Sequence, residues 1–168
     1  MNPPTPEELV ARYGLTPHPE GGYYRETYRS ALEISPVALP KEFSGPRACA
    51  TAVYFLLKEG EISRLHRLKS DELWHFYLGG PLELAQISPK GQVLTVVLGP
   101  DAAAGQTFQH AVPAGWWFGA APQVGAGYSL VGCTVSPGFD FADFELGARV
   151  KLLRRFPAAQ NVIERLAD

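Results

Sequence analysis

The stretch that decides the fold is residues 60–79, with the sequence GEISRLHRLKSDELWHFYLG. It contains two runs in which apolar and polar residues alternate, Ser63–Leu68 and Glu72–Leu78, and the turn sequence KSD lies between them at residues 69–71. Short runs of this kind, separated by turn residues, are typical of antiparallel sheets. The stretch therefore predicts two consecutive β-strands.

The same pattern continues on both sides of this stretch, from Cys49 to Val135. We expect strands over Ala50–Leu57, Ser63–Leu68, Glu72–Leu78, Leu82–Ser88, Val93–Leu98, Thr107–Val112, Gly115–Phe118 and Tyr128–Val135. Parallel strands need long crossovers, usually helices, and no segment of helix length lies between these runs. The 17 glycines and 15 prolines also argue against an all-helical chain. The sequence therefore predicts an all-β, antiparallel jelly roll.

Sequence patterns typical of helices occur only near the two ends of the chain. Thr5 and Glu8 have the spacing of a capping box, and Gly14 supplies a stop. Near the other end, Leu146–Phe156 and Ala158–Leu166 are separated by a proline and are expected to be helical. We therefore predict short helices before and after the sheets.

The length and composition favour one compact domain. The chain has 168 residues, 46% of them hydrophobic, and no internal repeat or linker-like tract. We predict a single domain over residues 1–168, with a barrel core at about 20–146 and a C-terminal helical tail at about 147–168.

The charge balance limits the kinds of partner. Seventeen acidic residues against 15 basic ones give a formal net charge of −2, which argues against binding to nucleic acid or an anionic membrane. No apolar run reaches the roughly 20 residues of a membrane span, and residues 1–4, MNPP, do not begin a secretory signal. We expect a cytoplasmic protein whose partner is a small molecule or a second copy of itself.

Cysteine use gives no sign of a metal knuckle or a disulfide framework. Cys49 and Cys133 are far apart and neither belongs to a CxxC motif. We expect both to be buried small hydrophobic residues.

The candidate chemistry lies in the opening stretch. Strand alternation places Arg64, His66 and Leu68 on one face, and Glu72 and Trp74 on one face of the next strand. A hairpin between the two strands would bring His66 and Glu72 together. A histidine that titrates near neutrality beside a carboxylate that orients it is a typical acid–base pair.

Two motifs resemble those of the cupin superfamily. The spacing of its first motif is matched by Gly60, His66, Glu72 and Gly79, although Leu68 replaces the second histidine. The sequence PAGWWF at residues 113–118 resembles the second motif, with Phe118 in place of its histidine. In metal-binding cupins three histidines and one glutamate hold the ion, so this resemblance leaves only His66 and Glu72 as ligands.

Three longer segments are similar to the fifth cupin family, a group of small single-domain proteins of undefined activity. They are HPEGGYYR at residues 18–25, SDELWHFY at 70–77 and VGCTVSPGFDF at 131–141. The resemblance runs from about Leu9 to Leu146. It implies a double-stranded β-helix barrel, a homodimer and a small-molecule pocket in the barrel, but no particular reaction.

A metal site and a metal-free site are both open at this stage. We expect no cofactor, because two ligands make a poor site for a divalent transition metal. His75 becomes a third ligand only if its strand bulges, since an odd offset from Glu72 points to the opposite face. On that opposite face, His75 and Tyr77 are instead candidates for a dimer interface.

Three hypotheses for the function follow. The first is a metal-independent enzyme or binder for a carbonyl-bearing ligand, with His66 and Glu72 as catalytic residues and Arg64, Trp74 and Phe118 as ligand-binding residues. Metal-independent sugar epimerases share the fold that the resemblance implies. The second is a metal-dependent oxygenase or isomerase. The third is a ligand-binding or structural module without turnover, in which His66 and Glu72 are a buried structural pair and the aromatic residues are core.

The segment HPEGG at residues 18–22 is predicted to be structural. Its proline and glycines fix a turn that directs the following strand, and Glu20 caps local backbone amides. The second possibility is that Tyr23, Arg25 and Glu26, which follow it, contribute to the mouth of a pocket or to a partner surface.

Overall fold

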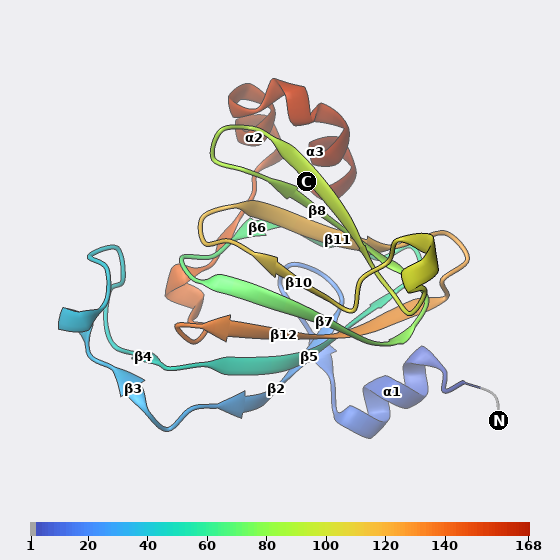
Figure 1. Cartoon of the computed structure of the whole chain (residues 1–168), viewed down its shortest axis with the longest axis horizontal. Helices are drawn as coiled ribbons and strands as arrows, with labels where there is room; N and C mark the ends of the chain where they lie inside the picture. The colour runs from blue at the N-terminus through green and yellow to red at the C-terminus, as the bar shows by residue number, and fades with distance from the viewer. Residues whose placement is uncertain (1–2) are drawn as a thin grey trace.

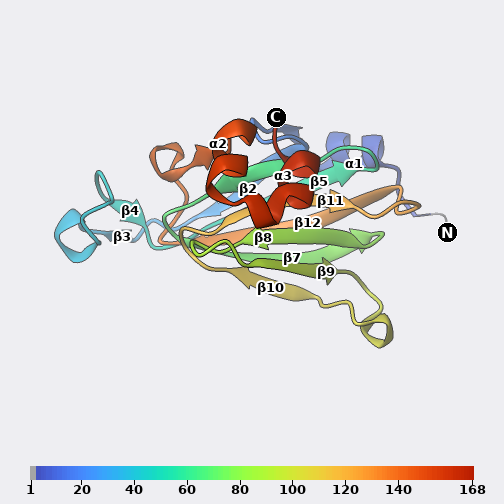
Figure 2. The same ribbon diagram turned by 90° about the horizontal axis from the view of Figure 1, so that it is seen from above.

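The computed structural model describes residues 3–168 and contains two antiparallel sheets that face each other as a barrel (Figures 1 and 2). One sheet has the order β1-β2-β5-β12-β7-β10 and the other β13-β6-β11-β8-β9. The six strands of the first are β1 (Thr16–Pro17), β2 (Tyr23–Arg29), β5 (Thr51–Lys58), β12 (Tyr128–Ser136), β7 (Asp71–Gly79) and β10 (Gln109–Val112). The five strands of the second are β13 (Glu145–Leu146), β6 (Ser63–Arg67), β11 (Trp117–Pro122), β8 (Leu82–Ile87) and β9 (Val93–Leu98).

The predicted all-β class, with short helices near its ends, is confirmed. Every expected strand between Cys49 and Val135 is present, most within one residue of its expected bounds. The main difference is β11, which begins at Trp117 and runs to Pro122 instead of covering 115–118. Gly115 has a φ of +77° and forms the turn before this strand, so the extended backbone starts after it.

The expected hairpin between β6 and β7 is wrong. The two strands are consecutive in the chain but belong to different sheets, so the turn at residues 69–71 crosses from one wall of the barrel to the other. Side chains on their inner faces therefore meet across the barrel interior rather than side by side on one surface.

The inner faces of the two sheets form the main core. Trp74 and Phe118 are among its largest fully buried side chains, and their rings meet edge to face at 6.3 Å. Other fully buried members of this core are Leu82, Leu84, Leu98, Val112, Ala120 and Val131. This apolar packing fills part of the barrel and leaves a cavity in the rest of it.

Helices cover the outer faces (Figure 1). The helices α2 (Arg149–Arg155) and α3 (Gln160–Leu166) pack against the five-stranded sheet through Leu152, Phe156, Ile163 and Leu166, with the 3-10 turn η4 (Pro157–Ala159) between them. The helix α1 (Pro6–Tyr13) packs through Leu9 on the outside of β5 and has the predicted capping box. Within residues 3–168, no helix is both long and apolar enough to cross a membrane.

An arm projects from the six-stranded sheet (Figures 1 and 2). It consists of β3 (Glu33–Ile34), the 3-10 turn η1 (Pro36–Ala38) and β4 (Arg47–Ala48). Its base is fixed by Arg47, which makes two hydrogen bonds of 2.6 and 2.8 Å to Asp143 in the 3-10 turn η3 (Phe141–Asp143). The remaining 3-10 turn, η2 (Ala102–Ala104), lies between β9 and β10.

Candidate functional site

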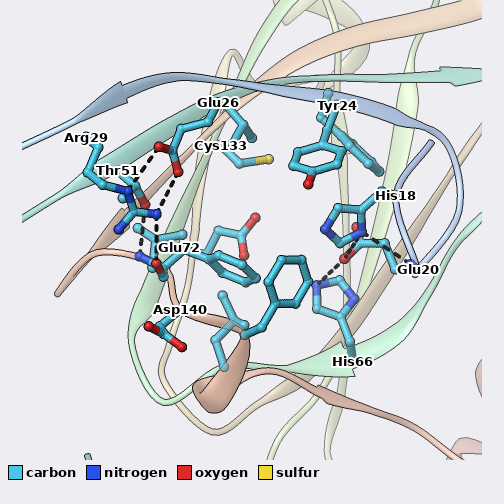
Figure 3. Close-up of a pocket in the computed structure, with 16 residues that line it drawn as sticks. His18, Glu20, Tyr24, Glu26, Arg29, Thr51, His66, Glu72, Cys133 and Asp140 are labelled. Atoms are coloured by element: carbon cyan, nitrogen blue, oxygen red, sulfur yellow. Dashed lines mark hydrogen bonds and ion pairs between the residues drawn. The ribbon is translucent and has the colours of Figure 1, made fainter. Parts of the chain in front are cut away.

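A cavity of about 510 Å³ opens between the two sheets (Figure 3). Its walls are largely apolar and include Tyr24, Val53, Phe55, Leu68, Val135 and Phe139. A polar set interrupts these walls: His18, Glu20, His66, Glu72 and Cys133. A mostly apolar cavity of this size with a few convergent polar groups is typical of a small-molecule site.

Glu20 lies at the centre of a buried cluster. Its Oε2 atom is 3.3 Å from Nε2 of His66 and 3.4 Å from Nδ1 of His18. Its Oε1 atom accepts a hydrogen bond of 2.7 Å from the Ser63 hydroxyl. Glu20 and His66 are only 6% and 2% exposed, so water cannot screen this cluster.

The hydrogen bonds of His66 define its tautomer. Its Nδ1 atom lies 2.7 Å from the carbonyl oxygen of Arg64, which can only accept, so Nδ1 carries the proton. A neutral ring then has an unprotonated Nε2, which lies 3.3 Å from Oε2 of Glu20 and can accept a hydrogen bond from that carboxyl when it is protonated. Both ring nitrogens of His66 are thereby occupied by protein groups.

His18 presents a nitrogen to the cavity. Its Nδ1 atom accepts a hydrogen bond of 3.2 Å from the backbone N–H of Glu20, so a neutral ring carries its proton on Nε2. Nε2 has no hydrogen-bond partner among residues 3–168 and faces the cavity in Figure 3. His18 is therefore better placed than His66 to touch a ligand.

Burial sets the protonation of the cluster. It raises the pKa of Glu20 to about 7, against the lowering effects of His18, the Ser63 hydroxyl and Arg64. It also lowers the pKa of His66 to about 4 and lowers that of His18, where Glu20 partly opposes it. Both histidines are neutral at pH 7, whereas Glu20 is close to its midpoint.

Glu72 approaches the cavity from the six-stranded sheet, opposite His66. Burial, with the nearby charge of Glu20, raises its pKa to about 8, although a hydrogen bond with the Cys133 side chain lowers it. Burial and the neighbouring Glu72 raise the pKa of the Cys133 thiol well above its ordinary value. At neutral pH this wall offers a protonated carboxyl and a protonated thiol, not a thiolate nucleophile.

The mouth of the cavity carries fixed charges. Arg29 donates two hydrogen bonds to Glu26, of 3.0 and 2.7 Å, and one of 3.2 Å to the Phe139 carbonyl oxygen. Asp140 lines the same edge. Arg29, the only arginine among the described residues that line this cavity, is therefore already paired with a carboxylate.

The structure brings His66 and Glu72 to the same cavity, although not as a contacting pair. His66 contacts Glu20, and Glu72 stands on the opposite wall beside Cys133. The catalytic roles assigned to His66 and Glu72 from the sequence stay predictions. Their common location is compatible with the first hypothesis, but the partner of His66 expected from the sequence is wrong.

The expected inward orientation of Arg64 is wrong as well. In the pairing of β6 with β11, Phe118 is opposite His66 and Ala120 is opposite Ser63, so β6 carries an extra residue at this point. Such a β-bulge reverses the alternation of side chains. Ser63 and His66 both face Glu20, whereas Arg64 points away from the cavity and pairs with Asp168.

The two aromatic candidates lie in the core beside the cavity. Trp74 and Phe118 are 0% and 1% exposed and do not belong to its lining. The ring of Phe118 packs on that of His66 with 4.1 Å between centroids. Both residues therefore support the cavity wall in this structure, and their assignment as ligand-binding residues stays a prediction.

His75 is outside the barrel. Its ring nitrogens lie 3.1 Å from the Thr134 hydroxyl and 2.8 Å from the Gln109 amide nitrogen. The register between β7 and β12 is regular from Glu72 to His75, and the irregularity comes only between His75's neighbour Phe76 and Leu78. The bulge that would turn His75 inward is absent from this part of the strand.

The residues at the cupin metal positions do not fit a metal. Leu68 and Phe118 have no donor atoms, and both nitrogens of His66 are used by Arg64 and Glu20. Among residues 3–168, no three His, Cys, Asp or Glu side chains are grouped so that they could hold an ion. We therefore derive no chemistry from a metal.

His18, Glu20 and Cys133 line the cavity but are not among the site residues predicted from the sequence. The signal available was two titratable residues in HPEGG, a segment singled out only as a turn. Gly21 and Gly22 adopt φ values of +112° and +69°, and a Cβ on Gly21 would lie 2.1 Å from the Ile62 carbonyl oxygen. The turn prediction is sound, but the turn also delivers Glu20 into the barrel. Cys49, expected to be buried, is only partly so.

Comparisons with known proteins agree with this fold. A family model described as cupin superfamily (DUF985) matches residues 7–147. Protein SO0799 of Shewanella oneidensis is 40% identical, with a TM-score of 0.89 and 99% of each chain covered. A hypothetical protein from Leishmania major is 37% identical, with a TM-score of 0.88 over 98% of this chain and 99% of that one. Oxalate decarboxylase from Bacillus subtilis, at 17% identity and a TM-score of 0.54, covers 89% of this chain and 36% of its own and shares the fold alone.

Proposed function

The chain belongs to the DUF985 family of the cupin superfamily, and from this premise we propose that its cavity binds a small carbonyl-bearing molecule and moves a proton on it, as isomerases and epimerases do. One observation carries the proposal. Two buried carboxyls, Glu20 and Glu72, reach one cavity from opposite walls, and both have pKa values raised into the neutral range. Carboxyls tuned in this way are typical of acid–base catalysis.

Glu72 supplies the acid. With a pKa of about 8 it is protonated at pH 7 and donates its proton to the carbonyl oxygen of the ligand. A hydrogen bond from a neutral carboxyl in an apolar wall stabilises the developing charge on that oxygen.

The Glu20 cluster supplies the base. When Glu20 loses its proton, near pH 7, the proton of His18 moves from Nε2 to Nδ1. Nδ1–H then donates to the Glu20 carboxylate in place of accepting from the Glu20 backbone N–H, and Nε2 becomes a free base. Nε2 then takes the proton from the carbon beside the carbonyl, while Glu72 protonates the oxygen. Return of the proton to the former carbonyl carbon completes an isomerisation. Its return to the opposite face of the original carbon completes an epimerisation.

The remaining residues hold this machinery in place. His66 uses both of its nitrogens on protein groups, so its role is to position Glu20 and not to touch the ligand. The apolar walls exclude water from the ligand, which strengthens each hydrogen bond inside the cavity. Cys133 contributes a second, weak donor beside Glu72.

Deuterium exchange tests the proposal. Fructose, xylulose and pyruvate are each incubated with the protein in D₂O, and incorporation at the carbon beside the carbonyl is followed by NMR. We expect incorporation with at least one probe, and its loss in Glu72→Gln and in His18→Asn. The matched control is Glu145→Gln, which changes an exposed carboxylate on the edge strand β13.

Two results would contradict the proposal. If a probe perturbs cavity resonances without any incorporation, the cavity is a binding site without turnover. If incorporation proceeds equally in Glu72→Gln and His18→Asn, the chemistry occurs elsewhere.

A further inference from the structure

Arg64 connects the Glu20 turn to a distant part of the chain on the outside of the barrel. Its guanidinium donates to the carbonyl oxygens of Glu20, at 3.3 Å, and of Pro19. A third donor bonds the Asp168 carboxylate at 2.5 Å. The side chain therefore bridges the turn before β2 and the segment after α3.

The backbone of Arg64 contacts the same cluster from the other direction. Its N–H donates to the Glu20 carbonyl oxygen at 2.8 Å, and its own carbonyl oxygen accepts from Nδ1 of His66 at 2.7 Å. One residue thus holds the main chain of Glu20 and sets the tautomer of the ring that Glu20 contacts.

The bulge in β6 makes this arrangement available. Because it reverses the alternation, Ser63 and His66 both face inward and flank the Glu20 carboxyl, while Arg64 between them faces outward. A regular strand would direct Arg64 and His66 to the same side. The guanidinium would then lie in the cavity and could not reach the carbonyl oxygens of the turn from outside.

We propose that Arg64 is a positioning residue that fixes the Glu20 carboxyl against His18 and His66 by clamping the turn that carries it. Arginine suits this role because its planar fork presents several donors in fixed directions, whereas a lysine ammonium is a single point of charge. Asp168 completes the clamp by holding the end of the guanidinium that faces away from the turn. Its carboxylate is 72% exposed, so its share of the effect is the smaller one.

The protein alone allows a direct test, independent of any ligand. Carbon-13 NMR follows the titration of the Glu20 carboxyl, and the nitrogen-15 chemical shift of Nε2 of His66 reports its contact with that carboxyl. The variants are Arg64→Met and, as a matched control, Arg67→Met. Arg67 lies on the same strand and also pairs with a carboxylate, Glu145, but its side chain does not line the cavity.

The clamp predicts a clear split between these variants. In Arg64→Met the pKa of Glu20 rises, because the positive charge that lowers it is gone, and the Nε2 chemical shift of His66 changes, because the Glu20 carboxyl is no longer held against it. In Arg67→Met both signals stay at their wild-type values. If Arg64→Met leaves the Glu20 titration and the His66 Nε2 shift unchanged, the proposal is wrong.

A second pair of variants keeps the test decisive if Arg64→Met does not fold. Arg64→Lys retains the charge but loses the fork, and Asp168→Asn retains the fork but loosens one end. The clamp predicts a changed Nε2 chemical shift of His66 in Arg64→Lys and a smaller change in the same direction in Asp168→Asn. Wild-type shifts in both variants would overturn it.

A kinetic test of the Arg64→Lys variant rests on the proposed function. With a probe that undergoes deuterium exchange, we expect kcat to fall about tenfold in Arg64→Lys, as a small misplacement of a reacting group does, with KM nearly constant. A rise in KM at constant kcat would instead make Arg64 part of ligand binding and contradict a positioning role. If no probe undergoes exchange, the proposed function fails, whereas the NMR result still decides the role of Arg64.

Discussion

Two buried carboxyl groups of this molecule have different partners and opposite shifts in pKa. Asp143 meets the guanidinium of Arg47 through two hydrogen bonds, and Lys69 lies 3.2 Å from it. Glu20, equally buried, meets only neutral imidazoles and a hydroxyl.

The pKa values follow from these partners. Burial raises the pKa of Asp143, but the hydrogen bonds from Arg47 and Lys69 outweigh it and leave the pKa below its ordinary value. Burial raises the pKa of Glu20 to about 7 because no cation compensates it inside the cavity. A buried carboxyl paired with a guanidinium stays ionised at neutral pH and has a structural role. A buried carboxyl beside neutral histidines can hold or release a proton near neutral pH.

The largest expected effect concerns proton transfer. Replacing Glu72 by Gln keeps the shape of the cavity wall but removes the transferable proton, so exchange into an active probe should fall by about 10²- to 10⁴-fold. The rate of deuterium incorporation measures this loss. If the rate of deuterium incorporation in Glu72→Gln stays within a few fold of the wild-type rate, the distinction between a structural carboxyl and a proton-transferring one is wrong.

The next effect concerns the structural pair. Arg47→Met leaves Asp143 buried with only Lys69 beside it, so the free energy of unfolding should fall by about 3 kcal/mol. Urea unfolding measures it. The matched variant is Glu20→Gln, which removes a carboxyl that is not part of a fixed ion pair and should cost less. Equal losses in the two variants would contradict the comparison.

The pH dependence of stability gives a third effect. Glu20 and Glu72 bind protons more tightly in the folded chain, with pKa values of about 7 and 8 against 4.5 for an ordinary glutamate, so their ionisation destabilises the fold as pH rises. The lowered pKa of His66 acts in the opposite direction, but only below about pH 6.5. Between pH 6.5 and 8 the free energy of unfolding should therefore fall by about 1 kcal/mol per pH unit from Glu72, which stays mostly protonated in the folded chain, and by about half as much from Glu20.

Urea unfolding at pH 6.5 and 8 checks this slope, and Glu72→Gln should flatten it. Asp143 contributes nothing in this interval, since its lowered pKa confines its effect to acid. Stability that does not fall from pH 6.5 to 8 would show that the cavity carboxyls ionise as ordinary ones do.

The smallest effect concerns Lys69. Its side chain is 31% exposed and is the second cation on Asp143, so Lys69→Met should lower the free energy of unfolding by less than about 1 kcal/mol. Urea unfolding beside Arg47→Met compares the two cations. A larger loss in Lys69→Met than in Arg47→Met would mean that the bidentate pair is not the principal contact.

The sheets could be predicted from the sequence because their signals are local. Turn residues such as Lys69-Ser70-Asp71 and Gly79-Gly80 interrupt runs whose alternation is visible in any short window. What a window does not show is which strand joins which sheet. The turn at 69–71 has the composition of a hairpin and yet leads from one sheet to the other.

The site could be predicted only in part for the same reason. His66 and Glu72 are on inner faces, as the alternation indicates, and both line the cavity. Arg64 does not point inward as predicted, because the alternation of β6 is interrupted by a bulge that depends on its pairing with β11. Glu20 meets His66 only after the chain has folded, across more than 40 positions, so its partner could not be found by spacing.

The most direct test of the account is a carbon-13 NMR titration of the carboxyl groups in the ligand-free protein. The account predicts midpoints near pH 7 for Glu20 and near pH 8 for Glu72, with Asp143 ionised throughout that range. Midpoints for Glu20 and Glu72 near the ordinary value of 4.5 would contradict it, because the cavity would then hold two permanent anions and no proton to transfer.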